Sequence, residues 1–385
     1  MEAKRKIAAI LVDRANYGRM KPVLLELRNR EDIELQLICT GTMLLNRFGD
    51  ASKIVENDGF EINGTAYIEL EGSNPYTMSK TIGIGIMEFT NEFSRLKPDL
   101  VLIIGDRSEA LAATISAVYM NICVAHIQGG EVSGSIDESA RHAISKFSHY
   151  HFPSTTRSGD FLVRMGERPE TVFRVGCPSS DIVLNMDFSI TNQLLNETGI
   201  GTELDISKQF IMVSFHPTTT AYGSEISQID ELFKALIKIN KQVVWLWPNI
   251  DAGSDNIAKF IRHKRENDKL ENFRFVKNYP PEDYLKIMAN AECLIGNSSS
   301  FVRDASFLGT PVILVGERQQ GRECAENVIK VKPKEDEIMK AFTKHMKIGK
   351  YSPSNLYGEG NSSKLIVEKL ADIKLYTQKL LGYVE

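Results

Sequence analysis

Short apolar runs rich in β-branched residues alternate with longer amphipathic segments along most of the chain. This pattern predicts strands buried on both faces, with helices between them. In the first half the expected strands are Lys6–Val12, Ile33–Gly41, Asp99–Gly105, Ile122–Ile127 and Val172–Gly176. In the second half they are Phe210–Phe215, Gln242–Trp247, Phe273–Lys277, Cys293–Gly296 and Pro311–Val315.

Helices are expected between these strands. In the first half they are Arg19–Asn29, Met43–Asn57, Ser79–Leu96, Ser108–Met120 and Asp137–Ser148. In the second half they are Glu225–Asn240, Asp255–Asn267, Asp283–Asn290 and Phe301–Leu308. Alternation of strand and helix predicts an α/β fold with two doubly wound, Rossmann-like domains that face each other.

The expected domains are residues 1–180 and 205–360, with a linker near Gly199–Lys208. A last helix, Ser363–Leu381, lies in the segment 361–385, which we expect to fold back onto the first domain. The length of 385 residues suits two domains of ordinary size.

Composition narrows the class of protein. Hydrophobic residues make up 42% and charged residues 25%, and the formal net charge is −4, so no global basic field favours nucleic acid or an anionic membrane surface. The apolar run near the N-terminus is too short for a signal peptide, and no stretch approaches a membrane span. Five cysteines, three of them in apolar runs, indicate reduced thiols and a cytoplasmic protein.

Polar residues follow two of the first-half strands. Asp13-Arg14-Ala15-Asn16 comes after the first, and Gly105-Asp106-Arg107-Ser108-Glu109 after the third. Ligands of open parallel sheets bind at the carboxyl ends of the strands, so Arg14 is a candidate phosphate clamp and Asp106 a candidate for chemistry. The alternative is that these carboxyl and amide groups only cap the following helices.

The densest polar segment runs from His126 to His142 and contains Gly129, Gly130 and Gly134. Glu131, Asp137 and Arg141 lie in or just after this glycine loop, and carboxylates that converge on one cleft suit acid–base work. The alternative for Asp137 and Arg141 is a surface ion pair. Glu138 fits a capping box with Ser135, which favours a structural role.

Three further groups follow strands of the second half. His216 ends the first of these strands and could donate to a phosphate or sugar oxygen, although a lone histidine can also be structural. The segment Asn297-Ser298-Ser299-Ser300 opens a helix. Its three consecutive serines are more than one helix cap requires, so the segment predicts an anion-binding site. Arg318 and Arg322 in the segment 316–323 add positive charge nearby, unless they are only solvated.

Several motifs are absent from the sequence. No glycine-rich dinucleotide fingerprint follows the first strand, and neither a P-loop nor a nucleophile elbow is present. His149-x-His151 lacks further ligands at zinc spacing, so both histidines are interpreted as structural. We therefore expect no cofactor and no metal.

These residues together resemble the UDP-N-acetylglucosamine 2-epimerase family, in its hydrolysing branch. The matching segments are Arg14–Tyr17, Gly105–Glu109, Gly129–Ile144, Trp247–Ser254, Asn297–Ser300 and Gly316–Val328. They span most of the chain in the family's order. The resemblance implies a fold like the glycosyltransferase-B group, with the site between the domains, and a homodimer or homotetramer.

The resemblance also implies roles for single residues. Asp106 and Asp137 match catalytic carboxylates, Arg141 a site arginine, and His216 a residue near the sugar or phosphates. The positions that match UDP contacts are Arg14, Ser298, Ser299, Asp304 and Arg318, and Arg107 and Asn249 are further candidates in matching segments. Many relatives have an acid–base glutamate where this chain has Gln128, so Glu131 is the candidate replacement.

The reaction implied is loss of UDP from carbon 1 with removal of the carbon 2 proton, which gives a 2-acetamidoglucal that is then hydrated to the free 2-epimeric sugar. Such a route needs a stabilised leaving diphosphate and carboxylates beside the sugar ring. UDP-N-acetylglucosamine and UDP-2,4-diacetamido-2,4,6-trideoxyglucose are both candidate substrates. The alternatives are a glycosyltransferase of the same architecture, a non-hydrolysing epimerase and a sensor that binds without chemistry.

Overall fold

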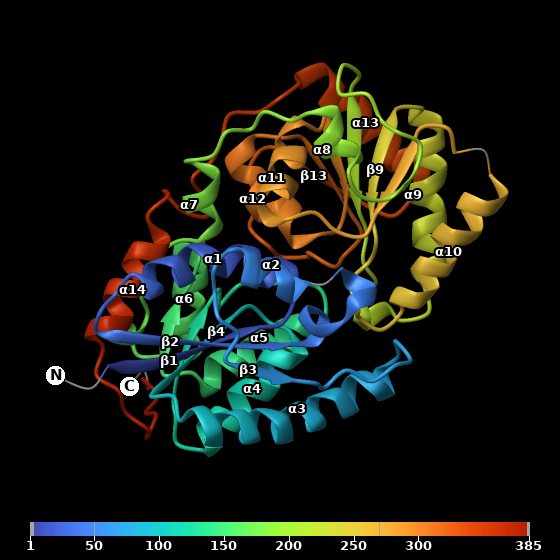
Figure 1. The fold of residues 1–385 in the computed structure, drawn as a ribbon. Coiled ribbons are helices and arrows are strands. Elements are labelled where there is room, and N and C mark those ends of the chain that lie inside the picture. Colours follow the sequence, from blue (N-terminus) through green and yellow to red (C-terminus); the bar gives the residue numbers. More distant parts are fainter. Residues whose placement is uncertain (1–3, 50, 269, 383–385) are drawn as a thin grey trace.

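The computed structural model describes residues 4–49, 51–268 and 270–382, which form two α/β units facing each other (Figure 1). The first unit contains a six-stranded sheet in the order β3-β2-β1-β4-β5-β6, with every pairing parallel. Its strands are β1 (Arg5–Leu11), β2 (Ile33–Thr40), β3 (Gly64–Ala66), β4 (Leu100–Ile104), β5 (Cys123–Ile127) and β6 (Tyr150–Phe152).

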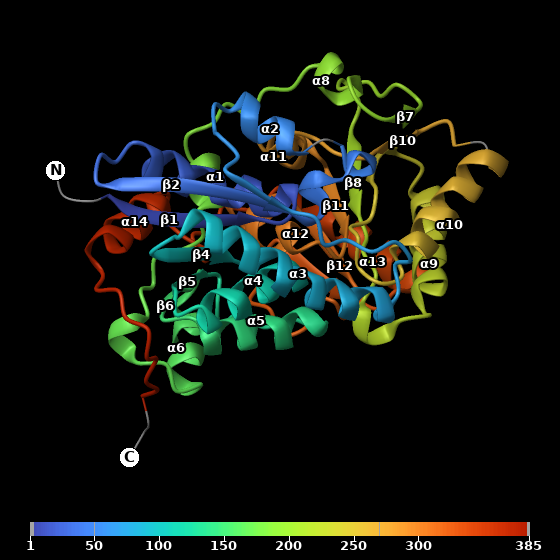
Figure 2. The ribbon, with the colours of Figure 1, turned by 60° about the horizontal axis from the view of Figure 1, so that its bottom comes forward.

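Helices cover both faces of this sheet. They are α1 (Arg14–Arg28), α2 (Ala51–Asn57), α3 (Pro75–Leu96), α4 (Ser108–Tyr119), α5 (Ile136–Phe147) and α6 (Thr156–Arg164). Helices α3, α4 and α5 lie side by side on one face, and α1 lies on the other (Figure 2). Successive residues of β1 therefore alternate between two cores, with Ile7 and Ala9 in one and Ala8 and Ile10 in the other.

The second unit contains a seven-stranded sheet in the order β13-β12-β11-β8-β9-β10-β7. Its strands are β7 (Ile200–Gly201), β8 (Phe210–Ser214), β9 (Gln242–Leu246), β10 (Phe273–Val276), β11 (Cys293–Gly296), β12 (Val312–Val315) and β13 (Val328–Val331). Only the edge strand β7 runs antiparallel among these described pairings. The side chains on the two faces of this sheet belong to two separate apolar cores.

The helices of the second unit follow its strands in turn. They are α9 (Glu225–Ile239), α10 (Ser254–Asn267), α11 (Pro281–Asn290), α12 (Ser299–Leu308) and α13 (Glu335–Ile348). The prediction of two Rossmann-like units in the manner of the glycosyltransferase-B group is confirmed by the two sheets and by the solved structures described below. Elements that the periodicity does not predict include β3, α6, β13 and α13.

Each sheet has one place where the strand order reverses. In the first unit this switch point lies between β1 and β4, and in the second between β8 and β11. The loops that leave neighbouring strands there turn to opposite faces, so a crevice opens at the carboxyl ends of the strands. The fold thereby brings Asp13, Asp106, His216 and Ser298, which follow these four strands, toward the space between the units.

The chain crosses between the units twice. It passes through the short helices α7 (Ser179–Val183) and α8 (Asn192–Asn196), and it returns through α14 (Ser362–Asp372). Helix α14 packs against α1, and Ile366 and Leu370 join the core of the first unit (Figures 1 and 2). The segment expected as a linker, 199–208, contains β7, which pairs with β10 and so belongs to the second sheet.

The predicted last helix, Ser363–Leu381, is wrong over its second half. Helix α14 ends at Asp372, because Ile373 has an extended backbone. The chain beyond it bonds to the first unit instead: Tyr376 donates its hydroxyl to the His149 carbonyl at 3.1 Å, and Lys379 Nζ donates to the Ser145 carbonyl at 2.9 Å.

Three other predicted elements differ. Helix α1 begins at Arg14 rather than Arg19, because the Asp13 carboxylate accepts the Asn16 N–H at 2.7 Å and caps the helix. The expected helix Met43–Asn57 is divided into two 3-10 turns, Gly41–Leu44 and Asn46–Phe48, followed by α2. The expected strand Val172–Gly176 contributes only an isolated bridge between Val172 and His151.

Two observations bear on the environment of the protein. All five cysteines are free thiols, and only Cys324 is partly exposed. Among the helices of the described residues, none combines the length and the apolar character that crossing a bilayer requires. The Glu167 carboxylate accepts a hydrogen bond from His151 Nε2 at 2.9 Å inside the first unit, which agrees with the structural interpretation of His151.

The docking of α14 gives a stability prediction. Leu370 is fully buried against the first unit, whereas Leu365 on the same helix is 37% exposed. Leu370→Ala should lower the free energy of unfolding by about 2–5 kcal/mol, because it removes buried methyl groups and leaves a cavity. Leu365→Ala is the matched control and should change it by less than about 1 kcal/mol. Equal urea midpoints for the two variants would show that α14 does not stabilise the first unit.

Candidate active site

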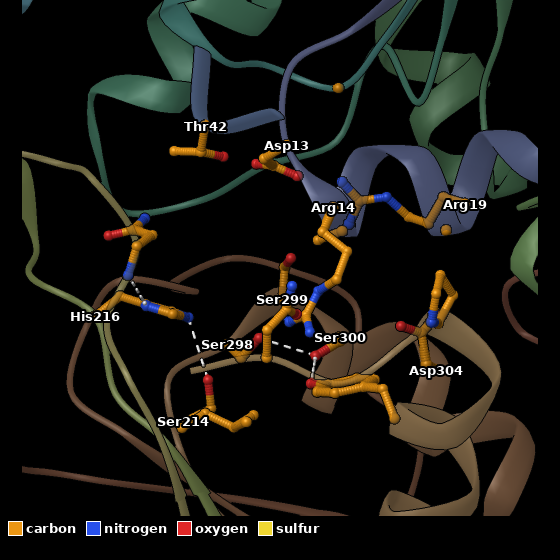
Figure 3. A pocket seen from close by; sticks show the side chains of 18 of the residues that line it. Asp13, Arg14, Arg19, Thr42, Ser214, His216, Ser298, Ser299, Ser300 and Asp304 are labelled. Carbon is orange, nitrogen blue, oxygen red and sulfur yellow. Dashed lines mark hydrogen bonds between the residues drawn. The ribbon is translucent and has the colours of Figure 1, made fainter. Parts of the chain in front are cut away.

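A cavity lies between the two units, at the carboxyl ends of both sheets. The first unit lines it with residues of the loops after β1, β4 and β5, and the second with residues after β8, β9, β11 and β12. Figure 3 shows the two groups facing each other, with Asp13, Arg14 and Arg19 on one side and His216, Ser298 and Asp304 on the other. The cavity therefore depends on both units.

Two arginines of α1 point into this space (Figure 3). The Arg14 guanidinium donates to the Tyr279 carbonyl and lies 5.9 Å from the centre of the Tyr284 ring. Burial lowers the pKa of Arg14 to about 10, so it remains cationic at neutral pH. Arg19 also lines the cavity, and its buried Nε has no hydrogen-bond partner among the described residues.

The serine-rich turn forms the opposite wall. Ser298 is the N-cap residue of α12, yet its Oγ bonds Ser300 Oγ at 2.8 Å, and no side chain in the described part of the chain caps this helix. Tyr284 OH holds Ser300 Oγ from the other side at 2.5 Å. The first N–H groups of α12 are thus left for a ligand, and the helix dipole favours an anion there.

Asp106 leaves the end of β4 and is held by the buried Arg141. Arg141 donates to the Asp106 carboxylate and also to the Glu131 carbonyl at 2.7 Å. Burial alone would raise the pKa of Asp106, but Arg141 and Arg322 outweigh it and hold that pKa well below the usual range. Asp106 is therefore an anion at neutral pH.

Asp137 lies in the first turn of α5 and behaves differently. It accepts a hydrogen bond from Ser135 Oγ at 2.8 Å, and its Oδ2 lies 3.5 Å from Arg318 Nη2. Burial and the nearby carboxylates Asp251 and Asp106 raise the pKa of Asp137 to about 6. Two carboxylates in one cavity thus differ in their affinity for a proton.

His216 is a neutral donor. Its Nδ1 accepts the backbone N–H of Asn249 at 3.1 Å, so the proton of a neutral ring lies on Nε2, which is 3.2 Å from Ser214 Oγ (Figure 3). Burial, together with Arg318, lowers the pKa of His216 to about 3. At neutral pH the ring can donate a hydrogen bond but carries no charge.

Most of the predicted site residues meet in this cavity. Its wall contains Arg14, Asp106, Arg107, Asp137, His216, Asn249, Ser298, Ser299, Asp304 and Arg318. Asp304 accepts the Ser179 hydroxyl at 2.7 Å, and Arg107 pairs with Glu109 at 3.2 Å.

Glu131 and Arg141 do not line the cavity, in contrast to what was expected of them. The Glu131 side chain is buried between Arg322, at 2.9 Å, and Arg303, at 3.3 Å. Burial opposes its ionisation, but these arginines lower its pKa below the usual value. Gln128 accepts from Arg303 at 2.9 Å, so its side chain also faces this buried cluster.

The backbones of the two units are in contact close to Asp137. The Gly134 N–H donates to the Arg318 carbonyl at 3.0 Å. A Cβ atom at Gly134 would lie 1.9 Å from the Glu317 carbonyl oxygen, so no other residue fits there without moving the loop. This glycine lets the loop after β5 touch the loop after β12.

Sequence reasoning missed Arg19, Tyr284, Arg303 and Asp251. The helix expected from Arg19 begins five residues earlier, at Arg14, and Arg19 lies on the cavity wall. Asp251 lies in the segment 247–254, which was noted only as part of the resemblance. The described residues contain no group of three or more His, Cys, Asp or Glu side chains that could hold a metal ion.

Comparison with known proteins supplies the family. The family model described as UDP-N-acetylglucosamine 2-epimerase matches residues 25–371. The chain is 35% identical over 376 residues to a Legionella pneumophila protein named UDP-N,N'-diacetylbacillosamine 2-epimerase (hydrolyzing), covering 98% of each chain. It is 28% identical to a Neisseria meningitidis UDP-N-acetylglucosamine 2-epimerase, covering 96% of this chain and 94% of that protein.

Solved structures share the fold. The Neisseria meningitidis UDP-GlcNAc 2-epimerase bound to UDP-GlcNAc superimposes with a TM-score of 0.79 at 20% identity, over 95% of this chain and 99% of that one. The Methanocaldococcus jannaschii UDP-GlcNAc 2-epimerase in complex with UDP-GlcNAc and UDP gives 0.78 at 19% identity, over the same shares of the two chains. The family match over most of the chain and the agreement in fold lead to one conclusion: this chain belongs to the UDP-N-acetylglucosamine 2-epimerase family.

Proposed function

We propose that this enzyme hydrolyses a UDP-linked 2-acetamido sugar and inverts its carbon 2, releasing UDP and the free 2-epimeric sugar. The observation that carries the proposal is the pairing, in one cavity, of an anion-binding helix start on the second unit with two unlike carboxylates on the first. The relatives named as hydrolysing 2-epimerases support the same reaction class.

The diphosphate would leave toward the second unit. The bare N–H groups at the start of α12, with Arg14 and Arg318, would stabilise the negative charge that develops on the leaving group. His216 would add a hydrogen bond from Nε2 without adding a charge that must be neutralised. This arrangement favours cleavage of the bond between carbon 1 and UDP.

Loss of UDP must be accompanied by loss of the carbon 2 proton, because that carbon is not next to a carbonyl and is only weakly acidic. We assign proton removal to Asp137, whose pKa of about 6 makes its ionised form a better base than the much weaker base Asp106. The ionised Asp106 would stabilise positive charge at the sugar ring. The product of this step is UDP and a 2-acetamidoglucal.

Water then adds to the glucal. The water oxygen bonds to carbon 1 and loses one proton, and a proton from solvent reaches carbon 2 on the face opposite the one that lost its proton, so the configuration of carbon 2 inverts. Glu131 would not take part directly, since it is buried between Arg303 and Arg322. We assign it to holding these two arginines beside Asp106.

Two substrates fit this proposal. The Legionella pneumophila relative is named for UDP-N,N'-diacetylbacillosamine, which is a UDP-2,4-diacetamido-2,4,6-trideoxyglucose, and the Neisseria meningitidis relative for UDP-N-acetylglucosamine. Either product is a mannose-type 2-acetamido sugar, the kind of precursor from which sialic-type or legionaminic-type nonulosonic acids are built. We further propose a cytoplasmic homodimer or homotetramer.

The products test the proposed reaction. Incubation of the enzyme with each UDP-sugar in D₂O, followed by ¹H and ³¹P NMR, should give UDP and a free mannose-configured sugar with deuterium at carbon 2. A UDP-linked epimer would instead indicate a non-hydrolysing enzyme, and a free sugar of unchanged configuration a transferase that uses water. No reaction with either substrate would favour a sensor. The faster substrate identifies the groups preferred at carbons 4 and 6.

Asp106 is tested by Asp106→Asn. This variant should reduce kcat by at least about 100-fold, because it removes the anion beside the reacting ring, while the Kd for UDP measured by calorimetry should change less than about 5-fold. Asp99→Asn, an exposed position at the opposite end of β4, is the matched control and should keep normal turnover. Near-normal turnover of Asp106→Asn would remove Asp106 from the mechanism.

A further inference from the structure

Asp251 lies just behind the cavity wall, at the boundary of the two units. It is 3% exposed and follows β9 in the loop that leads to α10. Its carboxylate accepts hydrogen bonds from Arg107 of the first unit and from the Asn249 side chain of its own loop. It also lies 3.4 Å from Arg318 Nη2. This single carboxylate therefore binds one arginine from each side of the cleft.

The Arg318 guanidinium is shared between two carboxylates. The same Nη2 atom lies 3.4 Å from Asp251 Oδ2 and 3.5 Å from Asp137 Oδ2. An arginine held between two acids neutralises neither of them fully, so the Asp137 carboxylate receives only part of the attraction of Arg318. Without the Asp251 charge, Arg318 would be free to pair with Asp137 alone.

The loop that carries Asp251 is fixed by other bonds as well. The Gly253 N–H donates to the Ser73 carbonyl at 3.0 Å, and Ser73 Oγ donates to the Asp251 carbonyl at 3.2 Å. These bonds cross between the units and use backbone atoms of the loop. These hydrogen bonds do not involve the Asp251 carboxylate, so they should still hold the loop when the charge of Asp251 is removed.

We propose that Asp251 is a positioning residue for the reaction: it holds Arg107 and Arg318 at the cavity and, by sharing Arg318, prevents that arginine from pairing with Asp137 alone. The inference rests on the proposed function only where it assigns the carbon 2 proton to Asp137. On this proposal the ion pair between Arg107 and Asp251, which joins the two units, also has a role in catalysis.

Asp137 faces charges from several elements, and each contributes to its protonation. The acids Asp251 and Asp106 raise its pKa, and Arg318 and Arg107 lower it. Arg141, one turn along α5, is paired with Asp106. Of these groups Asp251 is the one that adds a like charge from the second unit, so its loss should favour the ionised form of Asp137.

Substitution of Asp251 tests the proposal through a pH profile. In the unmodified enzyme kcat/KM should rise with pH through about 6, because only ionised Asp137 can accept the carbon 2 proton. Asp251→Asn should move this limb to lower pH by about 1 unit, since a nearby like charge is lost. It should also lower kcat more than it raises KM. Asp255→Asn, an exposed carboxylate in the first turn of α10, is the control and should leave the limb in place.

A second readout does not depend on activity. Titration of the Asp137 carboxyl by ¹³C NMR of aspartate-labelled enzyme, assigned with Asp137→Asn, should show the same downward shift of its midpoint in Asp251→Asn. Asp251→Ser serves where Asp251→Asn does not fold. An unchanged midpoint in a folded variant overturns the inference, whereas failure of the unmodified enzyme to release UDP overturns the proposed function and leaves this titration valid.

Discussion

Ion pairs buried across the gap between the two units are the interaction on which the site depends. Glu131 of the first unit lies between Arg303 and Arg322 of the second, and Arg107 of the first binds Asp251 of the second. A buried charge without its partner costs several kcal/mol, so these pairs hold the two units in the arrangement in which each charge meets its partner. In this arrangement Asp106 and Asp137 of the first unit line the same cavity as the serine-rich turn 297–300 of the second.

The same charges give the polar groups of the cavity different protonation states. Asp106, beside Arg141, stays ionised, whereas burial and the nearby acids Asp251 and Asp106 raise the pKa of Asp137 to about 6. His216 is kept neutral by burial and by Arg318. One anion, one group that exchanges protons and one uncharged donor are what elimination of a diphosphate and rehydration of the resulting alkene require.

The sequence was informative where a strand ends and uninformative where distant segments meet. Asp106 and Ser298 could be predicted because each directly follows an apolar strand, and parallel strands end at one edge. The pairing of Glu131 with Arg303 could not be predicted, because the two residues lie far apart in the chain. The hydrophobic periodicity of a segment does not reveal its contacts with the other unit. The last helix was extended too far, because the pattern of apolar residues continues past Asp372 although the chain there bonds to the first unit.

In the proposed reaction a single cavity holds both the diphosphate and the reacting sugar carbon. A crystal structure of the enzyme with UDP and 2-acetamidoglucal tests it most directly. The diphosphate should lie on the N–H groups of Ser299 and Ser300, with carbon 2 of the glucal within about 3.5 Å of the Asp137 carboxylate. UDP bound instead in the neighbouring pocket lined by Trp247 and Phe275, or a glucal remote from both Asp106 and Asp137, would rule out this arrangement.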